Sequence, residues 1–250
     1  MVLFDIRKAV VTEVANSCRT AAKMVGSRTY YSWLRRALPF RFRRRLAPLS
    51  RKFGADRGLP IDRYYIERFL SRYSEDIRGC VLEVEDASYT RRFGGNRVIR
   101  SEVLHARSDN PAATIVGDLA TGEAIPRNSF DCVILTQTLQ FIYDLPSAIL
   151  HTHAMLQRGG VLLATMPGIS QISRYDMDRW GDYWRFTSLS ARRLFEEIFG
   201  ESHVSVEICG NLLTSTAFLC GLSTEDMRPA ELDWCDEDYQ MVITVRAVRQ

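Results

Sequence analysis

The chain has 250 residues, of which 46% are hydrophobic and 25% charged, and its formal net charge is +3. This composition allows one large domain, or a domain with an extension, to bury a core. No run approaches 18 apolar residues and no signal-peptide pattern is present, so we expect a cytoplasmic protein without stable membrane insertion. The six cysteines are scattered without a C-x-x-C pair, which favours a reduced protein without a zinc site.

The first predicted element is a helix over residues 5–25 within a strongly basic N-terminal segment. Residues 1–55 hold 13 Lys and Arg residues against two acidic ones, so their net charge is +11 and that of the remaining chain is −8. Such a segment suits docking on the acidic body of its own chain or of a second subunit in a homodimer. Contact with an anionic membrane surface is a second alternative, and nucleic acid is the least favoured.

Helical and strand patterns follow in alternation. A helix is expected to begin near Pro60, because proline favours the first turn of a helix. A helix over 145–157 has Asp144 as its N-cap and is expected to end at Gly159-Gly160, and a further helix over 189–199 ends at Gly200. The short apolar runs predict strands at 80–84, 102–106, 113–117, 131–136, 161–166, 204–209 and 241–248.

This alternation predicts an α/β fold with a mostly parallel sheet covered by helices on both faces. Ligands of such sheets bind outside the carboxyl ends of the strands. The candidate site residues are therefore those that directly follow each strand: 83–89, 107–109, 118, 136–140 and 167 onward.

Four segments, in this order, resemble the class I S-adenosylmethionine-dependent methyltransferases: Val-Leu-Glu-Val at 81–84, Thr-Ile-Val-Gly-Asp-Leu at 114–119, the strand and loop at 130–140, and the helix–Gly-Gly–strand pattern at 156–165. The resemblance implies a Rossmann-like fold with a seven-stranded, mostly parallel sheet over residues 59–250. A basic, mainly helical extension would then cover residues 1–58. Segments 56–67 and 174–187 look like a bacterial branch that accompanies glycosyltransferases, which implies a role in natural product biosynthesis or glycan modification.

The resemblance implies S-adenosylmethionine as the cofactor. Its predicted binding residues are Arg63, Tyr64, Glu83, Glu85, Asp86, Asp118, Leu119, Thr136 and Gln137. Glu83 would accept a hydrogen bond from the cofactor's amino group, or form an internal ion pair. Asp118 would contact the adenine, or cap the following turn. Arg63 and Tyr64 would cover the methionine end, or pack as an ordinary amphipathic helix.

Two positions depart from the family pattern. Glu85 stands where the family has glycine, a residue that leaves room for a ligand close to the backbone. Arg107 stands where an acidic residue grips the ribose, and Asp109 or Glu102 would replace that acid after a shift of register.

The segment after the fifth strand is expected to contact the acceptor. Its predicted substrate-binding residues are Tyr175, Trp180, Tyr183, Trp184 and Arg185, and a structural cover is the alternative. Asp182 or Asp178 would act as the general base that deprotonates an acceptor hydroxyl. No metal site is expected.

The sequence thus predicts an S-adenosylmethionine-dependent O-methyltransferase whose small-molecule acceptor is a glycosylated or polyhydroxylated metabolite. The first alternative is a non-methylating cyclase, lyase or isomerase that uses the same scaffold with its altered cofactor loop. The second is a non-catalytic partner protein.

Overall fold

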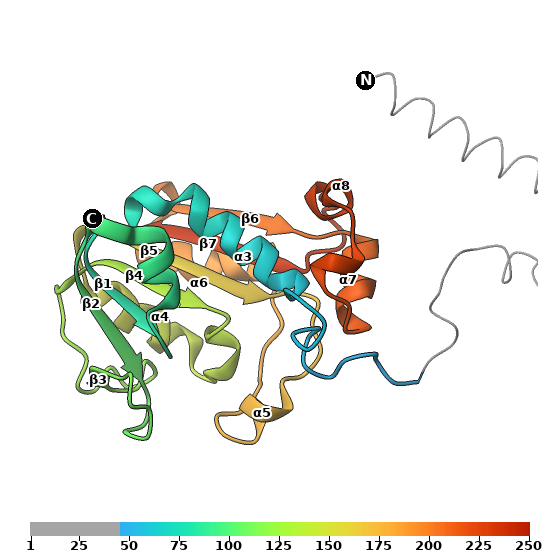
Figure 1. Cartoon of the computed structure of the whole chain (residues 1–250). Helices are drawn as coiled ribbons and strands as arrows, with labels where there is room; N and C mark the ends of the chain where they lie inside the picture. The colour runs from blue at the N-terminus through green and yellow to red at the C-terminus, as the bar shows by residue number, and fades with distance from the viewer. Residues whose placement is uncertain (1–45) are drawn as a thin grey trace, which may run out of the picture. The chain divides into compact units, whose positions relative to one another are not determined.

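The computed structural model describes residues 46–250, and residues 47–250 form one compact unit (Figure 1). The predicted helix over 5–25 and most of the basic segment lie outside the described residues. The segment before the first helix is attached to the C-terminal half of the chain, because the Leu49 amide donates to the Cys220 carbonyl at 2.7 Å. The division at residues 58 and 59 stays a prediction.

The core of the unit is a seven-stranded sheet with the order β3-β2-β1-β4-β5-β7-β6. All strands are parallel except β7, which pairs antiparallel with both β5 and β6. Each of the seven predicted strands is present. Their bounds are β1 Gly79–Val84, β2 Val98–His105, β3 Ile115–Val116, β4 Phe130–Thr136, β5 Leu156–Pro167, β6 Val204–Cys209 and β7 Val242–Val248.

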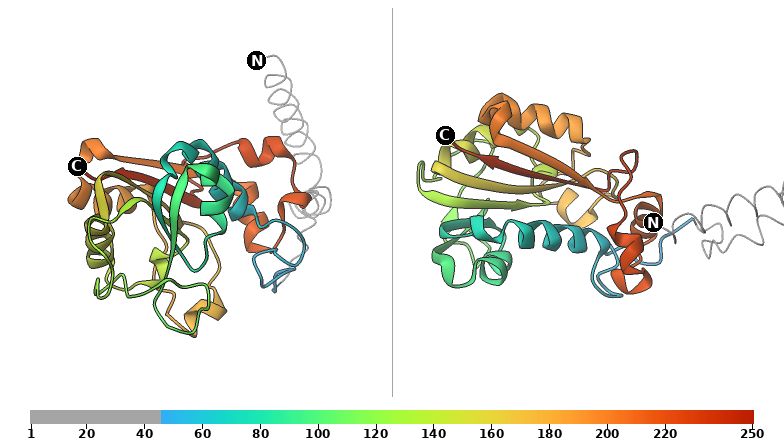
Figure 2. Two further views of the ribbon diagram at one scale, coloured as in Figure 1. Left: turned by 60° about the vertical axis from the view of Figure 1, so that its left-hand side comes forward. Right: turned by 90° about the horizontal axis from the view of Figure 1, so that it is seen from above.

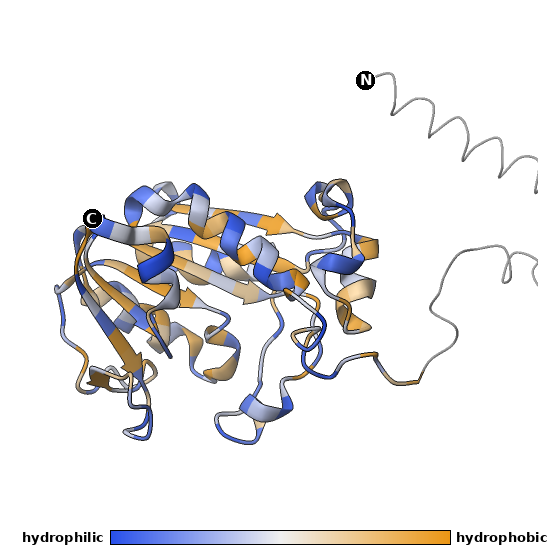
Figure 3. Cartoon of the chain, viewed as in Figure 1, coloured by the Kyte–Doolittle hydropathy of each residue, from blue (hydrophilic) through white to orange (hydrophobic). Residues whose placement is uncertain are grey.

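Helices cover both faces of the sheet (Figure 2). The helices are α3 Ile61–Arg72, α4 Leu145–Met155, α5 Arg174–Met177, α6 Ser188–Phe199, α7 Leu212–Leu219 and α8 Pro229–Asp233. On one face, α3 packs against alternate strand residues such as Val81 and Cys132. On the other, α4 and α6 pack against their neighbours Leu82 and Val133. Successive side chains of a strand point to opposite faces of the sheet. Because the strands have apolar residues at both odd and even positions, both faces of the sheet are buried under helices. Figure 3 shows the strands as predominantly hydrophobic between the helices.

Local signals set most helix ends. The Asp144 carboxylate accepts from the Ser147 amide at 3.2 Å and begins α4, and α6 ends before Gly200, which has a φ of +85°. The predicted end of α4 at Gly159-Gly160 is wrong. The helix ends at Met155 because Leu156 already pairs with Phe130 as the first residue of β5. Among the described residues, none of the helices combines the length and the apolar character needed to cross a bilayer.

Candidate functional site

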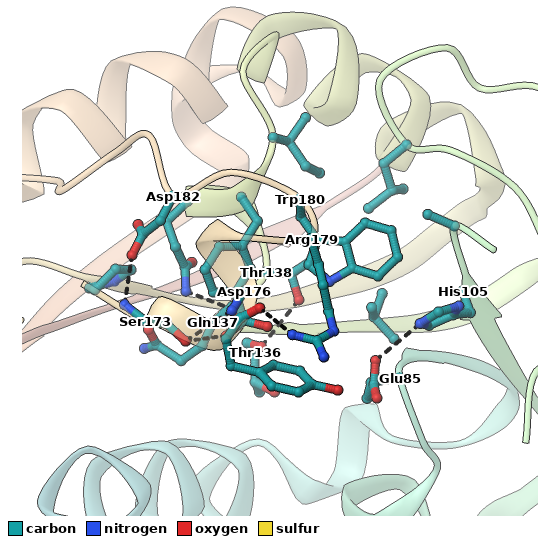
Figure 4. Close-up of a pocket in the computed structure, with 18 of the residues that line it drawn as sticks. Glu85, His105, Thr136, Gln137, Thr138, Ser173, Asp176, Arg179, Trp180 and Asp182 are labelled. Atoms are coloured by element: carbon teal, nitrogen blue, oxygen red, sulfur yellow. Dashed lines mark hydrogen bonds and ion pairs between the residues drawn. The ribbon is translucent and has the colours of Figure 1, made fainter. Parts of the chain in front are cut away.

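A cavity of about 1180 Å³ opens at the carboxyl ends of the parallel strands (Figure 4). Its walls come from the ends of β1, β2, β4 and β5, the segment that follows β3, the first turn of α3, and residues 170–185, which we call the strap. This is the edge of the sheet at which the sequence predicted the site. A cavity of this size can hold a large ligand, since small-molecule sites typically occupy about 300–1000 Å³.

Glu83 is the penultimate residue of β1 and organises the turn after the strand. Its buried carboxylate accepts from the Tyr89 amide at 3.2 Å, and from the Thr90 amide and hydroxyl at 2.7 Å each. Burial raises the pKa of Glu83, while these hydrogen bonds act in the opposite direction. Both oxygens are therefore occupied by the protein's own turn, although Glu83 also lines the cavity.

Glu85 adopts a backbone conformation that favours glycine, with a φ of +76°. The turn is held by its backbone, because its amide donates to the Leu104 carbonyl and its carbonyl accepts from the Asn110 side chain at 2.7 Å. The Glu85 carboxylate extends toward His105, at 3.3 Å from Nε2 (Figure 4). The neighbouring Asp86 accepts from the Ser88 amide and caps the turn.

The end of β2 carries an aromatic and charged cluster, of which only His105 was not predicted from the sequence. His105 is the last residue of the strand, and its ring lies edge-on to that of Trp180 from the strap at 5.5 Å (Figure 4). The Arg107 guanidinium also lies over Trp180. The signal that could have identified His105 in the sequence is its position as a polar residue at the end of a buried strand. Of the two acids suggested for this edge, Asp109 lines the cavity, whereas Glu102 lies within β2 and pairs with an arginine there.

Asp118 and Leu119 follow β3, and both line the cavity. The Asp118 carboxylate accepts from the Ala120 amide at 2.8 Å. The turn-capping contact offered as the alternative is therefore present, and Leu119 adds a buried apolar surface beside it.

The last residue of β4, Thr136, and Gln137 and Gln140 of the loop after it line the cavity. Gln137 has a φ of +49°, and its amide donates to the Thr165 carbonyl at 2.9 Å. Two buried side-chain atoms of this loop, Gln137 Nε2 and Gln140 Oε1, have no hydrogen-bond partner among the described residues. Unpaired buried polar atoms are costly, and in a cavity they indicate a missing ligand or water.

The first turn of α3 places Arg63 in the cavity, where its Nη1 donates to the Tyr89 hydroxyl at 2.9 Å. Burial alone would lower the pKa of Arg63, but Asp62 and the other nearby acidic groups raise it overall. Tyr64 is not among the residues that line the cavity, and its hydroxyl donates to Asp233 at 2.6 Å.

The strap brings Tyr175, Trp180, Tyr183 and Arg185 into the cavity lining, but Trp184 lies outside it. The Trp184 indole donates to the Ile142 carbonyl at 3.0 Å and packs against the core.

The two predicted base candidates differ in position. The Asp182 side chain is 1% exposed and pairs with both terminal nitrogens of Arg185 at 2.5 and 3.0 Å, while it also accepts from the Ser173 amide. Asp178 is exposed, pairs with Arg174 at 3.7 Å, and is not among the cavity residues. The structure thus brings Asp182 to the site but not Asp178.

The sheet order, with its antiparallel β7, defines the class I methyltransferase fold that the resemblance implied. Residues 95–164 match the family model described as a methyltransferase domain, which agrees with the resemblance over that part of the chain. The bacterial branch and its association with glycosyltransferases stay predictions.

Comparison with solved structures found several methyltransferases. A S-adenosylmethionine-dependent methyltransferase from Archaeoglobus fulgidus is 11% identical, with a TM-score of 0.49 over 75% of this chain and 94% of that chain. The N-methyltransferase NodS from Bradyrhizobium japonicum, in complex with S-adenosylhomocysteine, is 13% identical, with a TM-score of 0.49 over 77% of this chain and 89% of that chain.

A phosphoethanolamine N-methyltransferase from Haemonchus contortus is 14% identical, with a TM-score of 0.49. The match covers 74% of this chain and 52% of that protein. No match was found among curated protein sequences.

Proposed function

We propose that the protein is an S-adenosylmethionine-dependent O-methyltransferase that modifies a small glycosylated or polyhydroxylated metabolite. The observation that carries this proposal is the cavity at the carboxyl ends of β1, β2 and β4, with the glycine-like turn at Glu85 at its wall. The strap, with its tyrosines and polar groups, supplies a second wall suited to an acceptor rich in hydroxyls.

The residues present fit the cofactor by their chemistry. Arg63 offers a cation for a carboxylate, and Asp118 an acceptor for an amino group beside the apolar Leu104 and Leu119. Asp109 follows β2 and lines the cavity, and we propose that it binds the ribose hydroxyls. Arg63, Glu83, Glu85, Asp86, Asp118, Leu119 and Thr136 line this cavity and remain the proposed cofactor-binding residues, whereas we now assign Gln137, which also lines it, to the acceptor. When bound, the cofactor supplies a methyl group activated by its sulfonium.

The contacts of Asp182 favour a positioning role. Its carboxylate is buried and shared between Arg185 and the Ser173 amide, so it holds the strap in place. Arg185 also donates to the Ser170 and Gln171 carbonyls. These contacts fix the wall against which the acceptor would be oriented.

A different carboxylate, that of Asp62, is our candidate for the general base. Asp62 lies in the first turn of α3 and lines the cavity, and burial raises its pKa, although the neighbouring Arg63 opposes the shift. A raised pKa brings a carboxylate closer to neutral pH, where a base is most effective. We include Asp62 in the proposal as the group that takes the acceptor's proton.

The test is methyl transfer from S-adenosylmethionine with a deuterated methyl group to a panel of glycosides and polyols, followed by mass spectrometry. We expect one labelled methyl group on an acceptor oxygen. Asp62→Asn should lower turnover by about 10²-fold, the scale of a lost general base. Asp178→Asn is the matched control outside the cavity and should not change it. Conversion of an acceptor without transfer of the label would instead favour the cyclase, lyase or isomerase alternative.

A further inference from the structure

Arg179 is a cavity residue whose guanidinium is held in place by an aromatic ring. Its central carbon lies 3.5 Å from the centroid of the Tyr175 ring, and Nη1 donates to the Tyr175 carbonyl at 2.8 Å. Figure 4 shows Arg179 among the side chains that line the cavity, together with Gln137 and Thr138. Stacking orients the planar guanidinium before a ligand binds, so less conformational freedom is lost on binding.

The acids of the strap are directed to other partners. Asp176 accepts from the Ser173 hydroxyl, Asp178 pairs with Arg174, and Asp182 pairs with Arg185. Among residues 46–250, no ion pair involves Arg179, and its Nε and Nη2 have no protein acceptor. A positive charge with two donors thus remains available in the cavity, and the fork of an arginine matches the oxygens of a phosphate or carboxylate.

The loop after β4 contributes a second recognition element. Gln140 is 5% exposed, and its Nε2 donates to the Gln137 carbonyl at 2.8 Å, while its Oε1 has no partner in the described part of the chain. The Gln137 Nε2 is similarly unpaired there. One amide thus lacks a donor and the other lacks an acceptor. A hydroxyl group can supply both, since it donates and accepts.

The loop and the strap are joined directly, because the Tyr183 amide donates to the Gln140 carbonyl at 2.9 Å. The unpaired amides and the strap that carries Arg179 therefore belong to one wall of the cavity. A ligand that contacts both must combine hydroxyl groups with a negative charge.

We propose that the acceptor is a polyhydroxylated molecule with an anionic group, whose phosphate or carboxylate is bound by Arg179 and whose hydroxyls are bound by Gln137 and Gln140. This inference rests on the proposed function, since it names the substrate class of the same cavity. It adds a specificity-determining residue, Arg179, that distinguishes an acidic sugar from a neutral one.

The experiment is calorimetric titration of the full-length protein, with and without saturating S-adenosylhomocysteine, with three probes of similar size. Glucose 6-phosphate and glucuronate carry the two kinds of anion, and methyl glucoside is neutral. We expect at least one anionic probe to bind about tenfold or more tightly than methyl glucoside, as a charge-assisted contact implies. The stronger of the two shows which anion the site takes.

Arg179→Met should remove this preference, and added salt should weaken it. Arg174→Met is the matched control, because Arg174 belongs to the same strap but pairs with Asp178 and does not line the cavity. Gln140→Leu should lower the affinity for all three probes by a similar factor. If Gln140 took part only in anion binding, the affinity for the neutral probe would not change. Thermal unfolding of each variant checks that the protein is folded.

Equal affinity for neutral and anionic probes, or no binding of either anion, would overturn the inference. An equal loss in Arg174→Met and Arg179→Met would do the same. Binding of S-adenosylhomocysteine separates this failure from that of the proposed function. If S-adenosylhomocysteine binds and the anionic probes are not preferred, only the proposed acceptor class is wrong. If the anionic probes are preferred but S-adenosylhomocysteine does not bind, the methyl-transfer proposal fails and the anion site remains.

Discussion

Replacement of Glu85 by glycine tests how the altered cofactor loop works. Glu85 has a φ of +76° and directs its carboxylate toward His105, 3.3 Å away at the cavity wall. The turn itself is held by backbone contacts to Leu104 and Asn110, which a glycine would keep. Glu85→Gly therefore removes a side chain and a charge without removing the bonds that define the turn.

The expected stability change is a balance of three terms. Relief of a side chain at positive φ contributes about 1–2 kcal/mol, whereas the greater freedom of glycine in the unfolded chain costs roughly 0.4–1 kcal/mol. The Glu85 side chain is 72% exposed, so its contact with His105 is worth about 0–1 kcal/mol. Glu85→Ala loses the same contact but keeps a Cβ at positive φ. We thus expect Glu85→Gly to be about 1 kcal/mol more stable than Glu85→Ala.

Cofactor affinity should change as well. Removal of the side chain and of one like-charge contact with the cofactor's carboxylate should tighten S-adenosylmethionine binding by roughly 1–2 kcal/mol. Urea unfolding measures the first quantity and calorimetry the second, with Glu85→Gln as the control that removes the charge alone. Equal stability of the glycine and alanine variants would refute the backbone argument. Loss of native activity without tighter binding would show that Glu85 contacts a different ligand.

Three further results are expected. Asp182→Asn should destabilise the protein by about 1.5–3 kcal/mol, because a carboxylate that is 1% exposed loses its charge-assisted bonds to Arg185, whose side chain is 27% exposed. Exposed Asp178→Asn should cost less than about 1 kcal/mol. A fall in turnover with unchanged urea unfolding would instead support Asp182 as the base. Burial raises the pKa of Glu83 above its usual value of 4.5, so its contribution to stability is full below pH 4.5 and decreases as the pH rises through the folded-state pKa. Glu83→Gln should flatten that part of the pH–stability curve, and an unchanged slope would contradict this. Deletion of residues 1–45 should leave a cooperatively melting core, because residues 47–250 form a compact unit, and loss of folded protein would contradict that expectation.

The fold was predictable because the strands have apolar residues at both odd and even positions, and because capping residues mark helix ends. The end of α4 was not, because Gly159 and Gly160 are strong helix-ending signals. Here they lie within β5, where Gly160 accepts from the Arg249 amide and Gly159 donates to the Arg249 carbonyl. Pairing between distant segments decided the boundary, and a local pattern does not contain that information.

The site was predictable in outline but not in its partners. Position after a strand located Glu83, Glu85 and Asp118 at the cavity, since the topology of parallel sheets fixes that edge. The same reasoning could not show that Asp182 pairs with Arg185, or that Trp180 of the strap contacts His105. Those contacts depend on the path of the strap, which its sequence pattern does not specify.

The most direct test of the central claim is calorimetric titration of the full-length protein with S-adenosylhomocysteine, compared with Arg63→Met. If the cavity at the ends of β1, β2 and β4 is a methyltransferase cofactor site, the wild-type protein should bind one molecule with a micromolar dissociation constant. Arg63→Met should weaken binding by about tenfold or more, through loss of a charge-assisted contact to the carboxylate. Absence of binding by the folded wild-type protein at millimolar ligand would contradict the account.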